Sequence, residues 1–249
     1  MRISVSGTAN VGKSTLIKDF LKEWDMYTTP EKTYREFIQE QNLPHSSSTT
    51  KESQWQILNF TIDSMQQYQK GDKVIYDRCP LDSLAYTMWA YDKGTSDIDK
   101  EFVNKCIPIV RESLRMLDVI FLIPLTAAAP IPIEKDDMRD IDETFIKEID
   151  HIFKGFEQQY FQDTRNSPFF PTEDCPAIVE IFGSREQRLH LIKQYIDAEG
   201  DLIGETGSSI LGEEVLDMEQ ILRDQQQQLN KEKAQYNELM RQIQATKRR

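Results

Sequence analysis

The chain has 249 residues and a formal net charge of −12, with 39% hydrophobic and 29% charged residues. This length suits one large domain or a domain with an appendage, and no run is apolar enough to span a bilayer. Proteins that bind duplex nucleic acid through its phosphates are usually basic. The acidic net charge of this chain therefore favours a small-molecule partner.

The first informative stretch is residues 7–14, which read Gly-Thr-Ala-Asn-Val-Gly-Lys-Ser. They fit the phosphate-loop pattern of glycine, four free residues and Gly-Lys-Ser/Thr. A short strand is predicted over residues 3–6 and a helix from Ser14, the context that this loop needs. Two glycines leave room for phosphate oxygens against the main chain, and the helix adds its positive N-terminal end. A glycine-rich turn with a stray lysine would need neither flanking element.

The loop chemistry predicts a bound nucleotide and Mg²⁺ as cofactors and leaves ATP versus GTP open. Lys13 would reach the β- and γ-phosphates as a point charge, and the Ser14 hydroxyl would bind Mg²⁺. The nucleotide-binding residues expected in this stretch are Gly7, Asn10, Val11, Gly12, Lys13, Ser14 and Thr15.

A second short strand is predicted over residues 26–29, and a helix begins near Lys32. Glu31 and Arg35 follow this strand, four residues apart on one helical face. Ligands gather beyond the carboxyl ends of strands in parallel α/β sheets, which makes both residues candidates for acceptor binding. The alternative is an exposed ion pair.

A polar, turn-rich loop is predicted over residues 42–50, and we expect His45 in it to be solvent-exposed rather than catalytic. A long helix follows over residues 52–69. Its apolar face predicts the core positions Trp55, Leu58, Ile62 and Met65.

The second informative stretch joins a buried-strand run, residues 74–76, to Asp77 and Arg78, and Pro80 ends it. The carboxylate of Asp77 could hold the Mg²⁺ hydration shell or accept a proton from an attacking hydroxyl. Arg78 could neutralise charge on the transferring phosphoryl group. The alternative is a buried structural ion pair. A helix is predicted to follow over residues 81–90.

A helical pattern then covers residues 97–117 and is expected to kink or break near Pro108. It leads into a buried parallel strand over residues 118–123, which Pro124 ends.

The segment 127–140 is loose and contains Arg139, which is well placed for a lid that closes over ATP. A helix is predicted over residues 141–161 and a last strand over residues 177–182. Gly183 precedes the helix that reaches about residue 196.

Taken together, these stretches resemble the P-loop kinases of the nicotinamide riboside kinase-like type, the NadR kinase domain and its ATPase relatives, close to the deoxynucleoside and thymidylate kinases. The resemblance covers about the first two hundred residues. The motifs that carry it are residues 7–15, 30–36, 74–86, 136–139 and 181–188.

This resemblance implies an α/β fold with a five-stranded parallel sheet flanked by helices, with the loop strand central. It also implies Mg²⁺–ATP as the phosphoryl donor. It implies that Lys13 and Arg139 stabilise the moving phosphoryl group and that Ser14 and Asp77 manage Mg²⁺. Asp77 or Glu31 would orient or deprotonate the acceptor hydroxyl. Arg35 and Arg78 would hold the acceptor or its phosphate, and Gly183 would belong to the loop beside the nucleotide base. The family also contains proteins in which the bound nucleotide is regulatory.

Beyond residue 198 the composition changes. Residues 199–212 are rich in glycine and predict a linker, which leaves residues 1–198 as the kinase domain. Residues 213–249 predict a polar helix with an imperfect heptad pattern, as in a short coiled coil. We expect it to mediate self-association or to dock on a protein partner; the alternative is a helix packed on its own domain.

Three scattered cysteines without metal spacing predict a reduced, cytoplasmic compartment and no zinc site. Because the sequence enters its first strand directly after Met1-Arg2, we expect no signal or transit peptide.

The leading hypothesis is an ATP- and Mg²⁺-dependent kinase acting on a nucleoside, nucleotide or related ribosyl molecule. Two alternatives stay open. The acceptor could be a hydroxyl on a modified base within DNA, which the charge disfavours. The chain could also be a nucleotide-binding switch whose C-terminal helix is the working part.

Overall fold

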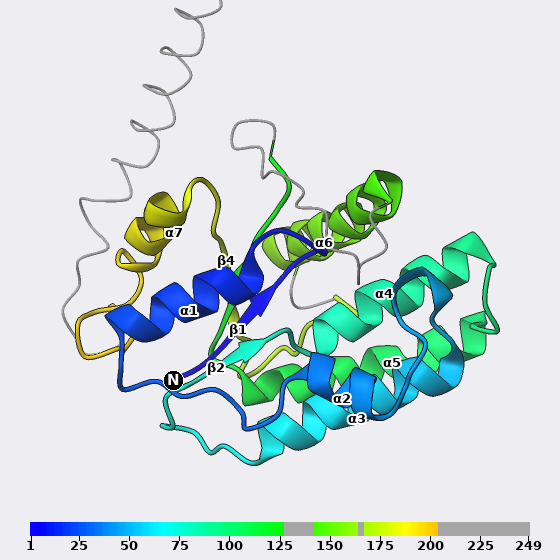
Figure 1. Ribbon diagram of the computed structural model, residues 1–249, viewed down its shortest axis with the longest axis horizontal. Helices are drawn as coiled ribbons and strands as arrows, with labels where there is room; N and C mark the ends of the chain where they lie inside the picture. The colour runs from blue at the N-terminus through cyan, green and yellow to red at the C-terminus, as the bar shows by residue number, and fades with distance from the viewer. Residues whose placement is uncertain (127–141, 164–166, 204–249) are drawn as a thin grey trace, which may run out of the picture. The chain divides into compact units, whose positions relative to one another are not determined.

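The computed structural model describes residues 1–126, 142–163 and 167–203 (Figure 1). The chain divides into two compact units, Met1–Asp201 and Leu202–Arg249. The predicted lid, with Arg139, and the predicted heptad helix of residues 213–249 lie outside the described residues. Within these residues, no helix combines the length and the apolar character that a membrane span requires.

The first unit alternates strands and helices. Its strands are β1 Arg2–Ser6, β2 Val74–Asp77, β3 Val119–Leu122 and β4 Ala177–Glu180. Its α-helices are α1 Lys13–Glu23, α2 Tyr34–Glu40, α3 Lys51–Gln66, α4 Pro80–Lys93, α5 Lys100–Ser113, α6 Glu143–Asp163 and α7 Arg185–Ile192. Short 3₁₀ turns cover Ser46–Ser48 and Leu114–Met116.

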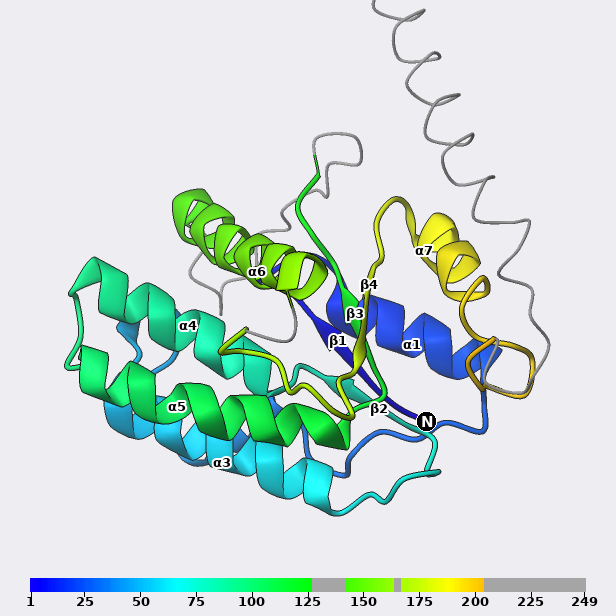
Figure 2. The same cartoon turned by 180° about the vertical axis from the view of Figure 1, so that it is seen from behind.

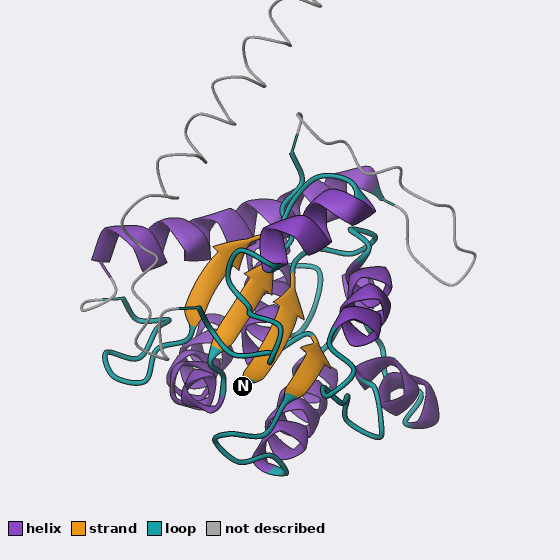
Figure 3. Cartoon of the chain, turned by 90° about the vertical axis from the view of Figure 1, so that its left-hand side faces the viewer, coloured by secondary structure: helices purple, strands orange, loops and turns teal. Residues whose placement is uncertain are grey.

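The four strands form one parallel sheet in the order β2-β1-β3-β4, so the strand before the phosphate loop is central. Figure 3 shows the strands side by side between layers of helices. Helices α1 and α7 cover one face of the sheet, and α3, α4, α5 and α6 lie on the other (Figures 1 and 2). The predicted α/β fold with a parallel sheet and flanking helices is confirmed.

The prediction of five strands is wrong for the described residues. The expected strand over residues 26–29 is reduced to one bridge, between Thr28 and Val74 of β2. Thr28 makes two main-chain hydrogen bonds there, from its N–H to Lys73 O at 3.0 Å and from Ile75 N–H to its carbonyl at 2.9 Å. Pro30 follows almost at once and has no N–H to extend the ladder.

A prediction for α5 also changes. The helix runs through Pro108 to Ser113 without a break. Pro108 is exposed, as is Asn104, whose carbonyl loses its helical donor to the proline. Water can satisfy that carbonyl, so the helix tolerates the residue.

The core beside the site is built around α4. The side chains of Ser4 and Ser6 face α4 from the central strand, and their small size lets the start of that helix approach the sheet. Ser6 Oγ donates a hydrogen bond to Asp82 at 2.7 Å. Of the predicted core positions in α3, Leu58 and Met65 are buried, whereas Trp55 and Ile62 are partly buried against the same core.

Candidate nucleotide and acceptor site

The phosphate loop, residues 7–14, connects β1 to α1, and its glycines are explained by backbone geometry. Gly7 has φ +134°, and a Cβ added there would lie 2.6 Å from the carbonyl oxygen of Ile123. Gly12 has φ +81° and stands immediately before the first residue of α1. Both conformations favour glycine, so these positions fix a tight turn in which successive N–H groups can face a polyphosphate.

The ammonium group of Lys13 lies inside this turn. Its Nζ donates a hydrogen bond to Gly7 O at 2.8 Å and another to Thr8 O. Burial, and next the positive charge of Arg78, hold the pKa of Lys13 well below its usual value. The side chain is therefore a desolvated cation at the place where phosphate charge would compensate it.

The hydroxyl of Ser14 donates a hydrogen bond to Asp77 Oδ2 at 2.8 Å. Asp77 ends β2, next to the loop strand, because the register pairs it with Val5. Its other oxygen, Oδ1, is buried and has no hydrogen-bond partner among the described residues. Two oxygen donors of the kind that Mg²⁺ prefers thus lie together, and one of them has spare capacity.

Arg78 has the unusual backbone angle φ +84°, and its N–H is held by Val5 O at 3.0 Å. A non-glycine residue in this region costs about 1–3 kcal/mol and often marks a functional site. Its guanidinium lies between two aromatic rings, 4.9 Å from the centroid of Tyr34 and 5.1 Å from that of Tyr86.

The ion pair expected as the alternative role for Arg78 exists, but with Asp82 rather than Asp77. Arg78 Nη1 donates to Asp82 Oδ1 at 3.0 Å, and both side chains are buried. Asp82 also accepts hydrogen bonds from Ser6 Oγ and from the Cys79 N–H. It therefore fixes the start of α4 and the direction of Arg78. Burial raises the pKa of the Cys79 thiol to about 12, which keeps that thiol protonated and a poor nucleophile.

Helix α2 carries Arg35 to the site. A capping box between Thr33 and Glu36 begins this helix. Arg35 lines the cavity described below, and it makes no hydrogen bond or ion pair within the described ranges. Glu31 is exposed and is not among the cavity-lining residues, so the structure does not bring the two candidates together.

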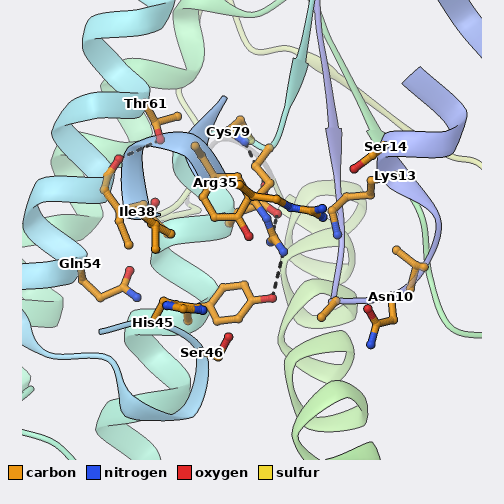
Figure 4. Close-up of a pocket in the computed structure, with 18 of the residues that line it drawn as sticks. Asn10, Lys13, Ser14, Arg35, Ile38, His45, Ser46, Gln54, Thr61 and Cys79 are labelled. Carbon is orange, nitrogen blue, oxygen red and sulfur yellow. Dashed lines mark hydrogen bonds and ion pairs between the residues drawn. The ribbon is translucent and has the colours of Figure 1, made fainter. Parts of the chain in front are cut away.

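One cavity of about 500 Å³ lies between the phosphate loop and helices α2, α3 and α4. Figure 4 shows side chains of these elements turned toward it. The residues that line the cavity come from six segments: 9–15 of the loop and α1; Tyr34, Arg35, Ile38 and Gln39; His45 and Ser46; Gln54, Ile57 and Thr61; Arg78, Cys79, Asp82, Ser83 and Tyr86; and Phe145 of α6. His45 is exposed, as expected, although it borders this cavity.

Gln54 is a candidate that the sequence did not indicate. It is 4% exposed, its Nε2 donates to Thr49 Oγ1 at 2.6 Å, and its Oε1 is buried with no partner in the described structure. Figure 4 shows its amide turned toward the cavity. Such an amide can recognise a polar edge of a ligand. A glutamine in an amphipathic helix reads as a solvent-facing residue, so no local pattern could have singled it out.

Gly183 lies outside the cavity lining but is joined to the loop through Arg188. Arg188 is 7% exposed, and it donates to Gly183 O at 3.1 Å and to Val11 O at 2.7 Å. A Cβ on Gly12 would meet the same guanidinium at 3.1 Å, so this glycine also makes room for the arginine. The segment around Gly183 is therefore tied to the phosphate loop.

The structure thus brings most of the predicted site residues together. Six of the predicted loop residues, Asn10 to Thr15 without exception, line one cavity together with Arg35 and Arg78, and Asp77 is hydrogen-bonded to the lining residue Ser14. Gly7, Glu31 and Gly183 lie outside the lining, and Arg139 falls outside the described residues.

A phosphate loop between the central strand of a parallel sheet and its following helix defines the class: a P-loop α/β protein. A family model described as an AAA domain matches residues 2–164. This span is more than half of the chain, which therefore belongs to the AAA domain family. No curated protein sequence matches the chain.

Solved structures with this fold include a deoxyadenosine kinase and NadR. Deoxyadenosine kinase from M. mycoides, with products bound, has 16% identity and a TM-score of 0.55, over 77% of this chain and 96% of that one. NadR in complex with NR has 16% identity and a TM-score of 0.52, over 78% of this chain and 51% of that one. The chain thus spans about half the length of NadR. At these identities the likeness shows the fold.

Proposed function

We propose that this chain transfers the γ-phosphoryl group of ATP to a nucleoside, a nucleotide or a related ribosyl small molecule. The observation that carries the proposal is that one cavity joins the phosphate loop to a wall made by α2, α3 and α4. A donor on the loop and an acceptor against that wall would share one enclosed space, as direct transfer requires.

On the donor side, the loop N–H groups and Lys13 would bind the phosphates of ATP. Lys13 is held by two carbonyl oxygens that cannot neutralise its charge, so a phosphate oxygen is the better partner. It would also stabilise the charge that spreads over the transferred group.

The donor set of Ser14 and Asp77 fits Mg²⁺, because Asp77 Oδ1 is buried without a partner in the described structure. When bound, the ion would neutralise charge on the β- and γ-phosphates. Asp77 would hold it through carboxylate oxygen, and the Ser14 hydroxyl would be its neighbour.

On the acceptor side, Arg35 and Arg78 would bind the acceptor. Arg139, in the expected lid, would act on the donor side and stabilise the transferred phosphoryl group. The finer assignment to the nicotinamide riboside kinase-like type rests on the motifs of the sequence and on the shared fold with NadR. Asp77 and Glu31 are the candidates to orient a hydroxyl acceptor.

The test is a screen for acceptor-dependent formation of ADP from ATP and Mg²⁺. The panel would contain nucleosides, nucleoside monophosphates, nicotinamide riboside and DNA with modified bases. We expect ADP to form with one class of small molecule, and Lys13→Met to lower the rate by about a hundredfold or more, as loss of a donor to transition-state charge does. Lys70→Gln, which removes an exposed lysine outside the cavity lining, is the control with unchanged activity.

Other outcomes favour the alternatives. ADP that forms with modified DNA alone would identify a DNA kinase. Tight ATP binding without ADP formation on any acceptor would refute the proposal and favour the nucleotide-binding switch.

A further inference from the structure

We propose that the acceptor is itself a phosphate monoester, a nucleoside monophosphate rather than a nucleoside, with its phosphate bound between Arg35 and Arg78. This inference rests on the proposed phosphoryl transfer and narrows it to one substrate class. Three features of the cavity support it: its cations, its occupied carboxylates and its opposite wall.

The first feature is positive charge with unused donors. Arg35 lines the cavity and makes no hydrogen bond or ion pair to any described residue. The Nε of Arg78 is buried and has no hydrogen-bond partner among the described residues. Figure 4 shows the guanidinium end of Arg35 directed toward the amine of Lys13.

Asp82 pairs with Arg78, but no described carboxylate forms an ion pair with Lys13 or Arg35. The cavity therefore keeps positive charge that a bound anion would balance. ATP on the phosphate loop would compensate Lys13 but would approach from the loop side. Arg35 and Arg78 come from α2 and from the carboxyl end of β2, on the acceptor side. The planar forks of two guanidinium groups match a phosphate, which can accept paired hydrogen bonds from each.

The second feature is the state of the carboxylates. Asp82 lines the cavity, but Arg78, Ser6 and the Cys79 N–H already occupy its oxygens. Asp77 is engaged by Ser14 on the magnesium side, and exposed Glu31 lies outside the lining. Asp77 and Asp82 therefore already have other partners, and neither is free to take a proton from a bound hydroxyl.

A phosphate acceptor needs no such base. Its second pKa is about 6, so near neutral pH it carries a nucleophilic anionic oxygen without further loss of a proton. That oxygen forms a bond to the γ-phosphorus of ATP while the bond from that phosphorus to the β–γ bridging oxygen breaks. The electron pair leaves with ADP, and the acceptor becomes a diphosphate, so atoms and charge balance.

The third feature is the wall away from the loop. Ile38, Ile57 and the Tyr86 ring provide apolar surface, and the buried amide of Gln54 offers a polar contact among them. A flat ring with a polar edge suits this combination, with apolar side chains to cover its faces and an amide for hydrogen bonding. Together with the cations at the loop end, the cavity matches a molecule with a base at one end and a phosphate at the other.

The test compares matched pairs, each a nucleoside monophosphate and its nucleoside, by calorimetry on the full chain. Saturating Mg²⁺ and a non-hydrolysable ATP analogue occupy the donor site, so that the monophosphate cannot bind there. We expect at least one monophosphate to bind about tenfold or more tightly than its nucleoside. Arg35→Gln should weaken the binding of the monophosphate by about tenfold or more, as the loss of a charged hydrogen bond predicts. The affinity for the nucleoside should stay unchanged. Lys70→Gln, which also removes one positive charge, should change neither.

Equal binding of the two members of every pair would overturn the inference, as would an equal loss for both in Arg35→Gln. In parallel, product chromatography with ATP and all pairs identifies what is phosphorylated. Diphosphate products support the inference, whereas transfer to nucleosides alone overturns it and leaves the proposed function intact. Transfer to neither class would refute the proposed function. The binding comparison would then still show whether the cavity binds a monophosphate more tightly than its nucleoside.

Discussion

At the scale of single residues, Gly7 and Gly71 separate two effects of a side chain. Both have positive φ, +134° and +103°, but only at Gly7 would a Cβ strike the main chain, 2.6 Å from Ile123 O; at Gly71 nothing lies within 4 Å. Gly71→Ala should therefore cost only backbone strain, about 1–3 kcal/mol. We expect Gly7→Ala to cost more than this, and also to reduce ATP binding, because the loop must move.

Urea denaturation gives the two free energies of unfolding, and titration with ATP gives the two affinities. The interpretation fails if both variants lose the same stability and bind ATP as the original chain does. In that case the close approach at Gly7 would have no part in shaping the loop.

The residues that the sequence revealed have local signatures. The loop has a fixed spacing, and Asp77 and Arg78 interrupt an apolar strand where packing gives them no reason to be. Gln54 has no such signature, because the cavity that it lines is enclosed by segments far apart in the sequence. Arg188 belongs to the motif 181–188, but its contact with Val11 spans 177 positions and is not written in that motif. Only the folded chain brings such contacts together.

At the scale of elements, α7 supports the phosphate loop from outside. Arg188 bonds to Val11 O, whereas Arg185, on the same helix, pairs with Asp19 of α1. We expect Arg188→Gln to weaken ATP binding by about tenfold, as the loss of a charged hydrogen bond would. Arg185→Gln is the matched control, since it removes the other arginine–helix contact without touching the loop.

Calorimetric titration with ATP would measure both variants, and thermal unfolding would show that each is folded. If Arg185→Gln weakens ATP binding as much as Arg188→Gln, general loosening of α7 explains the effect and the specific contact does not.

The contact between α6 and β4 predicts a dependence of stability on pH. Burial, and next the negative charge of Glu180, raise the pKa of Glu157 to about 7 from 4.5, in a site that also holds Lys154 and Asp150. The folded chain then binds a proton that the unfolded chain has released, so stability falls as the pH rises from about 4.5 to about 7. Glu157→Gln should reduce this loss and unfold at a higher temperature than the original chain at pH 8.

Thermal unfolding between pH 4 and pH 8 measures the effect. Asp63→Asn, at an exposed position of α3, controls for the change in net charge. An unchanged pH slope in Glu157→Gln would show that the carboxyl pair does not couple α6 to β4.

Elements were predictable where periodicity and length agree, as for α3 and the buried strands. The expected strand over residues 26–29 shows the limit of this approach. Its residue types suit a strand, but Pro30 and an edge position reduce it to one bridge at Thr28. Likewise, Pro108 suggests a helix break until its exposure in α5 is known. The pairing partner of a strand decides the first case and the solvent exposure of the proline decides the second. Both depend on the folded chain and not on the neighbouring sequence.

At the scale of the whole molecule, the heptad pattern of residues 213–249 predicts self-association. The comparison is sedimentation of the full chain against a version that ends at Asp201. This end point keeps contacts of the first unit, such as the hydrogen bond from Tyr27 OH to Gly200 O at 2.7 Å. We expect the full chain to form an oligomer and the shorter one to be a monomer; monomers in both would exclude self-association through this segment.

The central claim is that ATP on the phosphate loop and an acceptor in the adjoining cavity exchange a phosphoryl group directly. The most direct measurement follows the label of γ-labelled ATP in the presence of Mg²⁺ and a panel of nucleosides and nucleoside monophosphates. The account predicts label on one acceptor class in equal amount to the ADP formed, and loss of both products in Lys13→Met. Label recovered only as inorganic phosphate, with every acceptor unchanged, would contradict it, because the loop would then serve hydrolysis or signalling rather than transfer.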